Sequence, residues 1–347
     1  MFDSMKSPDG MMPGWTAESE RVAFERLPNR IMDILRTGAN KWGDRLALVE
    51  GTGRWTYGEL KDAVDGSQDW LRNSGVRPGD RVMLVAENCR AFVALMFAVS
   101  ALDAWPVPVN ARLSAREIGE IRDHSGARRI FYTVAASPHA KQHAEQSQLE
   151  VADVSPLGPI GIGRLNEDTK PERIESDGTK QVALLLYTSG TTGRPKGVML
   201  THRNVLFSAA TASTIRSLTP DDRLYGVLPM SHVVGCSAVL LSAIYSGASV
   251  FLSPRFDPVT AQGDIEKHGL TVFLGVPSMY ALLVEYAKLR RASSFKLPSL
   301  RIISCSGAPL GPGLKSDVER LFGLSLCNGY GLSETSPSLA QVHPDFP

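Results

Sequence analysis

The chain has 347 residues, of which 43% are hydrophobic and 21% charged, as is ordinary for a globular protein. This length exceeds the size at which a single core stops growing, so at least two packed lobes are expected. The formal net charge of +1 argues against a large nucleic-acid-binding face. The longest near-apolar run, Ser237 to Leu252, is too short to span a bilayer. It predicts a buried helix, a turn and a strand.

The cysteines and the N-terminus indicate a cytoplasmic protein. No two cysteines form a CxxC pair, so neither a zinc site nor a disulfide framework is expected at Cys89, Cys236, Cys305 or Cys327. This usage fits a reducing compartment. Residues 1–25 lack periodicity and an apolar signal segment, and they are predicted to form a flexible arm.

Helical and strand patterns alternate through the first half of the chain. Thr56 is a plausible helix N-cap, because Glu59 follows at the spacing of a capping box, and Gly75 is a plausible helix stop. Helices are predicted at 30–42, 56–74, 90–102 and 114–125, and strands at 46–50, 81–86, 105–109 and 129–133. Residues 137–180 are predicted to form loops and short strands, and the alternation resumes at Val182. The pattern predicts an α/β fold with two lobes of mostly parallel sheets flanked by helices.

The most informative segment, LLLYTSGTTGRPKGVML, spans Leu184 to Leu200. Glycines permit a tight turn and a close approach to a ligand, while hydroxyls, backbone N–H groups and a lysine can bind phosphate oxygens. It is not a Walker A loop, because the residue five positions after Gly190 is Pro195. The predicted phosphate-binding residues are Thr188, Ser189, Gly190, Thr191, Thr192, Gly193 and Lys196.

This loop resembles the signature loop of adenylate-forming enzymes, which include acyl- and aryl-CoA synthetases, luciferases and peptide-synthetase adenylation domains. Three further blocks resemble the same family in the expected order: LPMSH at 228–232, SCSGAPL at 304–310 and NGYGLSETS at 328–336. The resemblance runs roughly from Asn29 to the C-terminus. It is weaker in the first half, where segments 55–60, 79–82 and 106–110 carry it.

The resemblance implies roles for individual residues. Tyr330 would stack on adenine, and Glu334 would hold Mg²⁺ through a hard oxygen ligand. Ser333 stands where the family usually has a threonine that donates to the α-phosphate, and His232 would lie beside the reacting carboxylate and the thiol tunnel. The implied catalytic residues are Lys196, His232, Ser333 and Glu334. The nucleotide pocket would also include Gly307, Ala308, Pro309, Asn328, Gly329 and Gly331.

The resemblance also points to an acyl pocket whose predicted lining is small and largely apolar. Residues 231–241 contain no acidic side chain to pair with a substrate ammonium, which weighs against an α-amino acid. A hydrophobic aryl or fatty acid fits better than a dicarboxylate, whose second carboxylate would require an arginine in the pocket. Arg255 and Arg301 are candidates for that arginine, but each flanks a predicted strand and is expected at the surface. The predicted lining is His232, Val233, Val234, Gly235, Cys236, Gly275, Val276, Ser278, Cys305, Ser306 and Gly329.

The implied function is ATP-dependent activation of a small carboxylic acid to an acyl-adenylate and then to a CoA thioester. ATP, Mg²⁺ and CoA would take part. Residues 26–347 would form a truncated large AMP-binding domain of two interleaved α/β subdomains, with loop 187–197 at their junction. The β-barrel of this domain would be largely absent, and the small C-terminal domain lacking, so weak or no turnover is expected. A nucleotide- or acyl-binding fragment, or a ligase with another acyl acceptor, remains the alternative.

Overall fold

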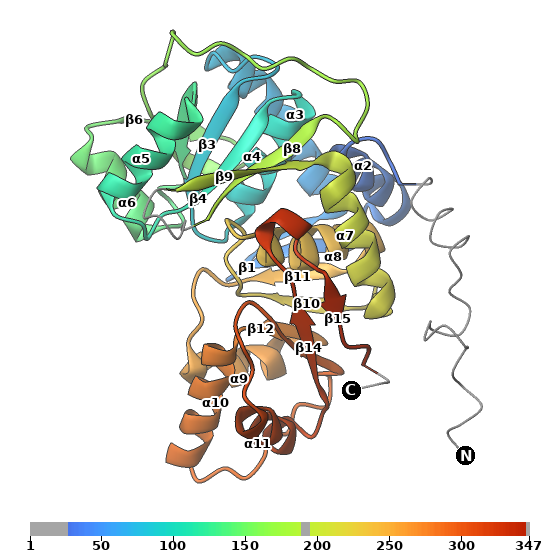
Figure 1. The fold of residues 1–347 in the computed structure, drawn as a ribbon. Helices are drawn as coiled ribbons and strands as arrows, with labels where there is room; N and C mark the ends of the chain where they lie inside the picture. Colours follow the sequence, from blue (N-terminus) through green and yellow to red (C-terminus); the bar gives the residue numbers. More distant parts are fainter. Residues whose placement is uncertain (1–26, 189–194, 345–347) are drawn as a thin grey trace.

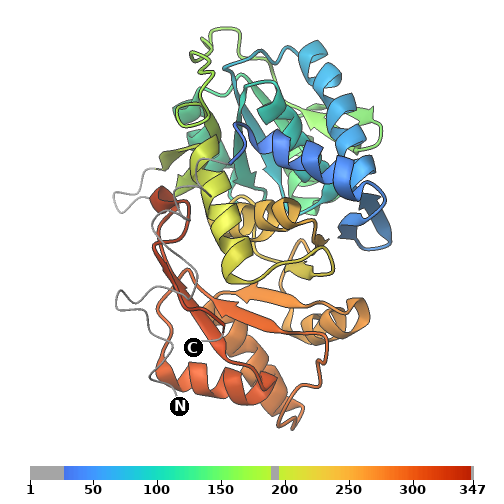
Figure 2. The same cartoon turned by 90° about the vertical axis from the view of Figure 1, so that its right-hand side faces the viewer.

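The computed structural model describes residues 27–188 and 195–344, which form two α/β lobes (Figure 1). The view turned by 90° separates the lobes along the vertical axis, with the orange and red C-terminal part of the chain in the lower one (Figure 2). Both lobes contain a sheet covered by helices, so the predicted fold class is confirmed. Within the described residues, no helix is long and apolar enough to cross a bilayer.

The first lobe contains a five-stranded sheet in the order β4-β3-β5-β7-β6. The three strands predicted from the sequence pair in parallel, whereas the last two are antiparallel. Helices α3 and α4 cover one face, and α5 and α6 pack on the other. The strands are β3 (Arg81–Ala86), β4 (Trp105–Asn110), β5 (Arg129–Tyr132), β6 (Glu150–Val154) and β7 (Gly158–Ile162).

The predicted helices of the first half are confirmed to within one or two residues. The Thr56 hydroxyl accepts a hydrogen bond from the Glu59 N–H at 3.2 Å, and the Glu59 carboxylate accepts one from the Thr56 N–H at 2.7 Å. The expectation of only loops and short strands at 137–180 was incomplete, because Ser137 caps a helix there. The helices are α2 (Ile31–Trp42), α3 (Tyr57–Asn73), α4 (Arg90–Ala101), α5 (Ala115–Ser125) and α6 (Pro138–Gln146).

The second lobe contains an eight-stranded sheet in the order β15-β14-β13-β12-β10-β11-β1-β2. Six strands run parallel, and β2 and β15 close the edges in antiparallel pairing. Because β1 comes from the start of the chain and pairs with β11, the two lobes are interleaved. The strands are β1 (Leu46–Glu50), β2 (Gly53–Thr56), β10 (Arg223–Gly226), β11 (Ser249–Leu252), β12 (Val272–Gly275), β13 (Ile302–Cys305), β14 (Leu326–Tyr330) and β15 (Ala340–Gln341).

Helices cover both faces of this second sheet. Helices α7 (His202–Ile215) and α8 (Ser242–Ser246), with the helix η1 (Val234–Leu241), join the core shared with the first lobe. Helices α9 (Pro258–His268), α10 (Pro277–Leu289) and α11 (Pro312–Phe322) pack around a separate core that contains Phe273 and Tyr280. The helix predicted from residue 237 onward is confirmed, but η1 is a π-helix, a rare form often found at functional sites.

Strands β8 (Val182–Thr188) and β9 (Lys196–Thr201), which flank the predicted phosphate loop in the sequence, pair as an antiparallel hairpin. Residues 189–194, which include most of the predicted loop, lie outside the described residues. At the neck of the hairpin, Thr188 pairs with Lys196. Strand β8 packs on β4 of the first lobe, while β9 contacts η2 (Ser333–Thr335), which follows β14 of the second sheet. The hairpin therefore connects the two lobes (Figure 1).

Candidate functional site

A pocket of about 600 Å³ opens at the carboxyl ends of the parallel strands β10, β12, β13 and β14. Ligand sites of open α/β sheets are found at this edge, because the loops after successive strands converge there. Described residues that line it are Thr188, Arg216, Leu228, Pro229, His232, Val233, Val234, Gly235, Ala238, Val276, Ser304, Ser306, Gly307, Gly329, Tyr330, Gly331, Leu332, Ser333, Glu334, Pro337, Ser338 and Gln341.

The pocket brings together predicted residues from segments far apart in the sequence. The predicted residues that line it are Thr188, His232, Val233, Val234, Gly235, Val276, Ser306, Gly307, Gly329, Tyr330, Gly331, Ser333 and Glu334. Thr188 contributes the neck of the hairpin, and the others come from four separate loops that follow strands of the second sheet. The three blocks noted in the second half of the sequence therefore meet at one place.

Several predicted residues lie outside this pocket. Cys236, Gly275 and Cys305 are buried in the protein interior, and Ser278 is exposed in the first turn of α10. The sequence could not separate these from lining residues, because each lies within two positions of a residue that lines the pocket. Ala308, Pro309 and Asn328 are exposed neighbours of lining residues, and Lys196 is exposed beside Thr188. Ser189, Gly190, Thr191, Thr192 and Gly193 lie outside the described residues.

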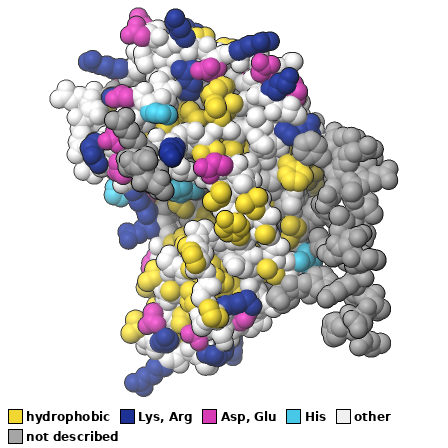
Figure 3. All heavy atoms as spheres, viewed as in Figure 1, with side chains coloured by type: hydrophobic (Ala, Val, Ile, Leu, Met, Phe, Trp, Pro, Cys, Tyr) yellow, Lys and Arg dark blue, Asp and Glu magenta, His cyan; other side chains and the backbone are white. Residues whose placement is uncertain are grey.

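The rim of the pocket offers an aromatic surface beside a tight backbone turn. Tyr330 is 63% exposed, and Leu332 and Leu339 are exposed near it. The view that includes β14, β15 and η2 shows hydrophobic side chains gathered over the centre and lower half of this face (Figure 3). A Cβ atom at Gly331 would overlap the carbonyl of Pro337, so this turn requires glycine. The exposed Tyr330 ring offers a flat surface on which a planar base can stack.

His232 lines the pocket two residues before η1, and η1 forms one wall of the pocket. Its imidazole makes no hydrogen bond to a described residue, and desolvation by the pocket walls lowers the pKa of His232 although the side chain is open to the cavity. Neutral imidazole is therefore the stable form at neutral pH. A Cβ at Gly235 would overlap the carbonyl oxygen of Pro229 and lie 2.7 Å from that of Leu228, so only glycine lets η1 approach this loop.

Asn88 fixes the loop that carries His232 and was not predicted. Its side-chain amide donates to the carbonyls of Gly226 at 3.0 Å and Leu228 at 2.9 Å, and its oxygen accepts from the Met230 N–H at 2.9 Å. Asn88 belongs to the first lobe, so its hydrogen bonds attach this loop of the second lobe to the first lobe. No local sequence pattern indicates this role, because the contact joins residues more than 130 positions apart.

Arg216, at the C-terminal end of α7, is a second lining residue that sequence reasoning missed. It is 4% exposed, its Nη1 atom donates to the Ala238 carbonyl on η1 at 3.2 Å, and its Nε atom has no partner among the described residues. Arg301, considered from the sequence as a pocket arginine, instead forms two 2.8 Å bonds with the Asp222 carboxylate. Arg255 is exposed and lines a different, smaller cleft.

Metal-binding capacity in the pocket rests on one carboxylate. Glu334 is exposed toward the cavity, and the described residues contain no group of three or more potential metal-ligating side chains. Mg²⁺ bound with a nucleotide takes one or two carboxylates together with phosphate oxygens and water. A single glutamate beside the hairpin neck fits that donor set, whereas it does not fit a metal held by protein ligands alone.

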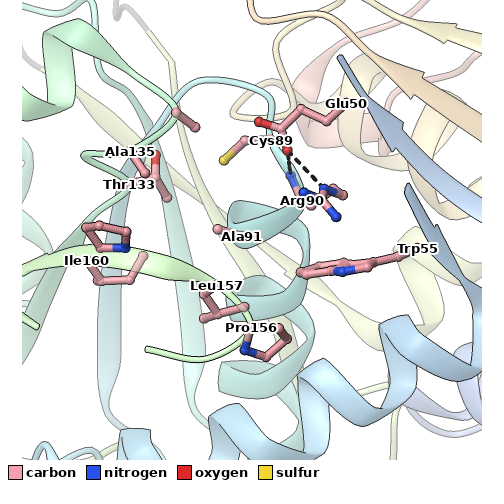
Figure 4. A pocket seen from close by; sticks show the side chains of 12 residues that line it. Glu50, Trp55, Cys89, Arg90, Ala91, Thr133, Ala135, Pro156, Leu157 and Ile160 are labelled. Carbon is pink, nitrogen blue, oxygen red and sulfur yellow. Dashed lines mark hydrogen bonds and ion pairs between the residues drawn. The ribbon is translucent and has the colours of Figure 1, made fainter. Parts of the chain in front are cut away.

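A smaller cavity of about 140 Å³ lies between β1, β2 and the start of α4 (Figure 4). There the Glu50 carboxylate accepts from the Arg90 N–H at 2.9 Å, and the Arg90 guanidinium lies over the Trp55 ring. Cys89 is buried beside them, and burial raises the pKa of its thiol to about 12. The charges of this cleft are paired internally and its cysteine is a neutral thiol, so it offers little to a ligand.

A family model described as AMP-binding enzyme matches residues 35–347. The chain belongs to this family. It is 34% identical over 294 residues to feruloyl-CoA synthase from Amycolatopsis sp, covering 84% of this chain and 57% of that protein. It is 31% identical to oxalate–CoA ligase from Arabidopsis thaliana, covering 87% of this chain and 60% of the ligase. The chain therefore spans less than two thirds of the length of these relatives.

Solved structures agree with this family assignment. The o-succinylbenzoate CoA synthetase of Bacillus subtilis, in complex with an acyl-adenylate intermediate, has a TM-score of 0.73 and 28% identity. That match covers 92% of this chain and 61% of the synthetase. The N-terminal domain of FACL13 from Mycobacterium tuberculosis has the same fold, with a TM-score of 0.75 at 24% identity and coverage of 92% of this chain and 79% of that one.

Proposed function

We propose that this chain supplies the ATP- and acyl-binding part of an AMP-forming acid–thiol ligase, which activates a carboxylic acid to an acyl-adenylate and then to a CoA thioester. The observation that carries the proposal is the convergence of Thr188, His232, Tyr330, Ser333 and Glu334 on one pocket. The related CoA ligases support the second step. For the acid, the apolar wall formed by Val233, Val234 and Ala238 favours a hydrophobic body, aryl or aliphatic.

In the first step, a carboxylate oxygen of the acid attacks the α-phosphorus of ATP, and pyrophosphate leaves with its bonding electrons. Negative charge develops on the phosphoryl oxygens, so donors fixed around them lower the barrier. Lys196 and the hydroxyls of Thr188 and Ser333 are the proposed donors. Mg²⁺ held by Glu334 would neutralise phosphate charge when the nucleotide is bound. Tyr330 would stack on the adenine ring.

In the second step, the CoA thiolate attacks the acyl carbon, the C–S bond forms, and AMP leaves with the bridging oxygen. His232 is neutral in this pocket because desolvation lowers its pKa, so it can accept or donate a hydrogen bond without adding charge. We assign it the orientation of the carboxylate before attack. The Asn88 amide acts through the 228–232 loop and is a positioning residue for His232.

Two substitutions test this proposal in an ATP–pyrophosphate exchange assay with a panel of aryl and fatty acids. Lys196→Ala is expected to slow adenylation tenfold to a hundredfold, which corresponds to about 1.4–2.8 kcal/mol of barrier. Glu334→Gln keeps the size of the side chain but removes its charge, so it is expected to raise the Mg²⁺ concentration needed for exchange. Lys170→Ala, which changes an exposed lysine outside the pocket, is the control. Unchanged exchange and Mg²⁺ dependence in both variants would contradict the assignment.

A further inference from the structure

Arg216 is a buried cation without an anionic partner, and it lines the proposed acyl pocket. Within residues 27–188 and 195–344, no carboxylate forms an ion pair with it. Its two hydrogen bonds both leave from Nη1, to the Ala212 carbonyl at 3.4 Å and to the Ala238 carbonyl at 3.2 Å. A guanidinium has five N–H donors. The Nε donor is buried and has no acceptor among the described residues, and Nη2 forms no hydrogen bond with a described residue.

The surroundings do not neutralise this charge. Asp222 lies close in the fold, but its two oxygens are taken by Arg301, whose Nη2 also donates to the Arg216 carbonyl at 3.0 Å. Cys327 interacts electrostatically with Arg216, yet burial raises the pKa of the Cys327 thiol, so it is uncharged at neutral pH. Burial lowers the pKa of Arg216 only to about 10, which leaves the guanidinium protonated.

A buried unpaired charge costs several kcal/mol, and proteins retain one where something else pairs with it. Because Nε is buried, Nη2 is the donor that can pair with a carboxylate, through a charge-assisted hydrogen bond. Arg216 also contacts the π-helical wall through Ala238, six residues beyond His232. At a rise of 1.5 Å per residue, the wall spans no more than roughly 9 Å between those two positions.

We propose that the activated acid carries a second carboxylate, which pairs with the Nη2 donors of Arg216 in the pocket. This inference rests on the proposed function, and it narrows the acid from a simple hydrophobic one to a dicarboxylate with a medium-length apolar spacer. One carboxylate reacts beside His232, while the other is held by Arg216. The spacer lies along Val233, Val234 and Ala238.

The test measures binding by calorimetry, so it does not depend on turnover. Three stable analogues of the adenylate, in which a sulfamate replaces the phosphate, carry an octanoyl, an 8-hydroxyoctanoyl or a suberoyl tail, the last ending in a carboxylate. Adenosine sulfamate without a tail reports on the nucleotide site alone. The suberoyl analogue is expected to bind at least about tenfold more tightly than the octanoyl analogue, since a charge-assisted hydrogen bond is worth that much.

Arg216→Met removes the charge and keeps a long apolar side chain. It is expected to weaken suberoyl binding about tenfold to a hundredfold and to leave octanoyl binding equal or tighter. Arg216→Lys keeps the charge but loses the fork, so an intermediate loss is expected. Arg255→Met changes an exposed arginine outside the pocket and serves as the matched control. Thermal unfolding of each variant checks that it is folded.

The outcomes separate the two proposals. If the sulfamate and the octanoyl analogue bind, but suberoyl binds no better and Arg216→Met changes nothing, the dicarboxylate inference is wrong and the proposed function stands. If the hydroxyl tail matches suberoyl, the pocket selects a neutral acceptor and the inference is also wrong. If none of the four compounds binds, the proposed nucleotide site fails and the inference fails with it.

Discussion

Among the described residues, the pockets around Arg90 and Arg216 differ in whether the charge of the arginine is paired. In the cleft of Figure 4, Arg90 is paired with Glu50 and covered by Trp55. In the larger pocket, Arg216 is more deeply buried and has no paired carboxylate among the described residues. The first arrangement is complete without a ligand and contributes to stability. The second leaves donors unused, which is the state expected of a binding group.

The same contrast separates His202, which is buried, from His232, which is open to the pocket. The Nδ1 atom of His202 accepts a hydrogen bond from the Ile31 N–H at 3.1 Å, which ties the start of α7 to the start of α2. His232 has a lowered pKa for the same reason, desolvation, but its ring has no hydrogen bond to a described residue. Burial alone therefore does not distinguish a structural group from a functional one, whereas unsatisfied hydrogen-bonding capacity does.

The largest effect on the free energy of unfolding is expected when a fully buried carboxylate, that of Asp80, is removed from its arginine partners. Asp80 is 0% exposed and accepts from the Arg77 Nη2 atom at 2.9 Å, while the Arg128 guanidinium lies 3.2 Å from it. Asp80→Ala is expected to lower the free energy of unfolding by about 3–5 kcal/mol, because it leaves Arg128 buried and unpaired. Urea denaturation measures this loss. Asp62→Ala, at an exposed position on α3, should change it little, and equal losses in both variants would refute the argument.

His202 is expected to give a smaller, pH-dependent effect. Burial lowers its pKa to about 3, below the ordinary value of 6.5, so the unfolded chain binds a proton that the folded chain rejects. Its contribution to stability is complete above pH 6.5 and decreases as the pH falls toward 3. Between pH 7 and pH 5 the loss is about 2 kcal/mol. His202→Asn keeps an acceptor for the Ile31 N–H and should remove this part of the pH dependence, so identical pH profiles would contradict the prediction.

The ion pair between Glu50 and Arg90 in the smaller cleft should contribute less to the free energy of unfolding, because both side chains are partly exposed. The Glu50 and Arg90 side chains are 29% and 25% exposed, so water screens their interaction. Glu50→Gln keeps an acceptor for the Arg90 N–H and removes the charge, with an expected loss of about 1 kcal/mol. Asp69→Asn is the matched control and should lose less, because the Asp69 side chain that pairs with Arg72 is 81% exposed. A loss as large as that of Asp80→Ala would show that exposure does not rank these pairs.

Arg216→Met is expected to have the smallest effect on stability, even though Arg216 is buried. No ion pair is lost among the described residues, and an apolar side chain replaces an unpaired charge, so the free energy of unfolding should change by less than about 1 kcal/mol or rise. Arg128→Met is the matched comparison. It removes one of the two arginines that pair with the buried Asp80 carboxylate, so it should lower the free energy of unfolding markedly. A large loss for Arg216→Met would mean that its bonds to Ala212 and Ala238 are structural.

The sequence alone determined the fold class and the family, because both depend on local patterns. Alternating helix and strand signals predicted the parallel sheets, and the Thr56–Glu59 capping box was visible as a spacing. The blocks around Thr188, His232 and Glu334 could be found as short motifs, since each lies in a contiguous stretch. Their meeting at one sheet edge follows from the fold, because strand ends of a parallel sheet lie side by side.

Which polar groups find partners depends on contacts that form only in the folded chain. Arg216 and Arg301 look alike in the sequence, but Asp222 pairs with Arg301 and leaves Arg216 open to the pocket. Likewise, Cys305 and Ser306 are adjacent, yet Cys305 is buried in the core and Ser306 lines the cavity. Asn88 reaches its loop across more than 130 residues. Pairing and exposure of this kind depend on contacts between distant segments, which no local pattern encodes.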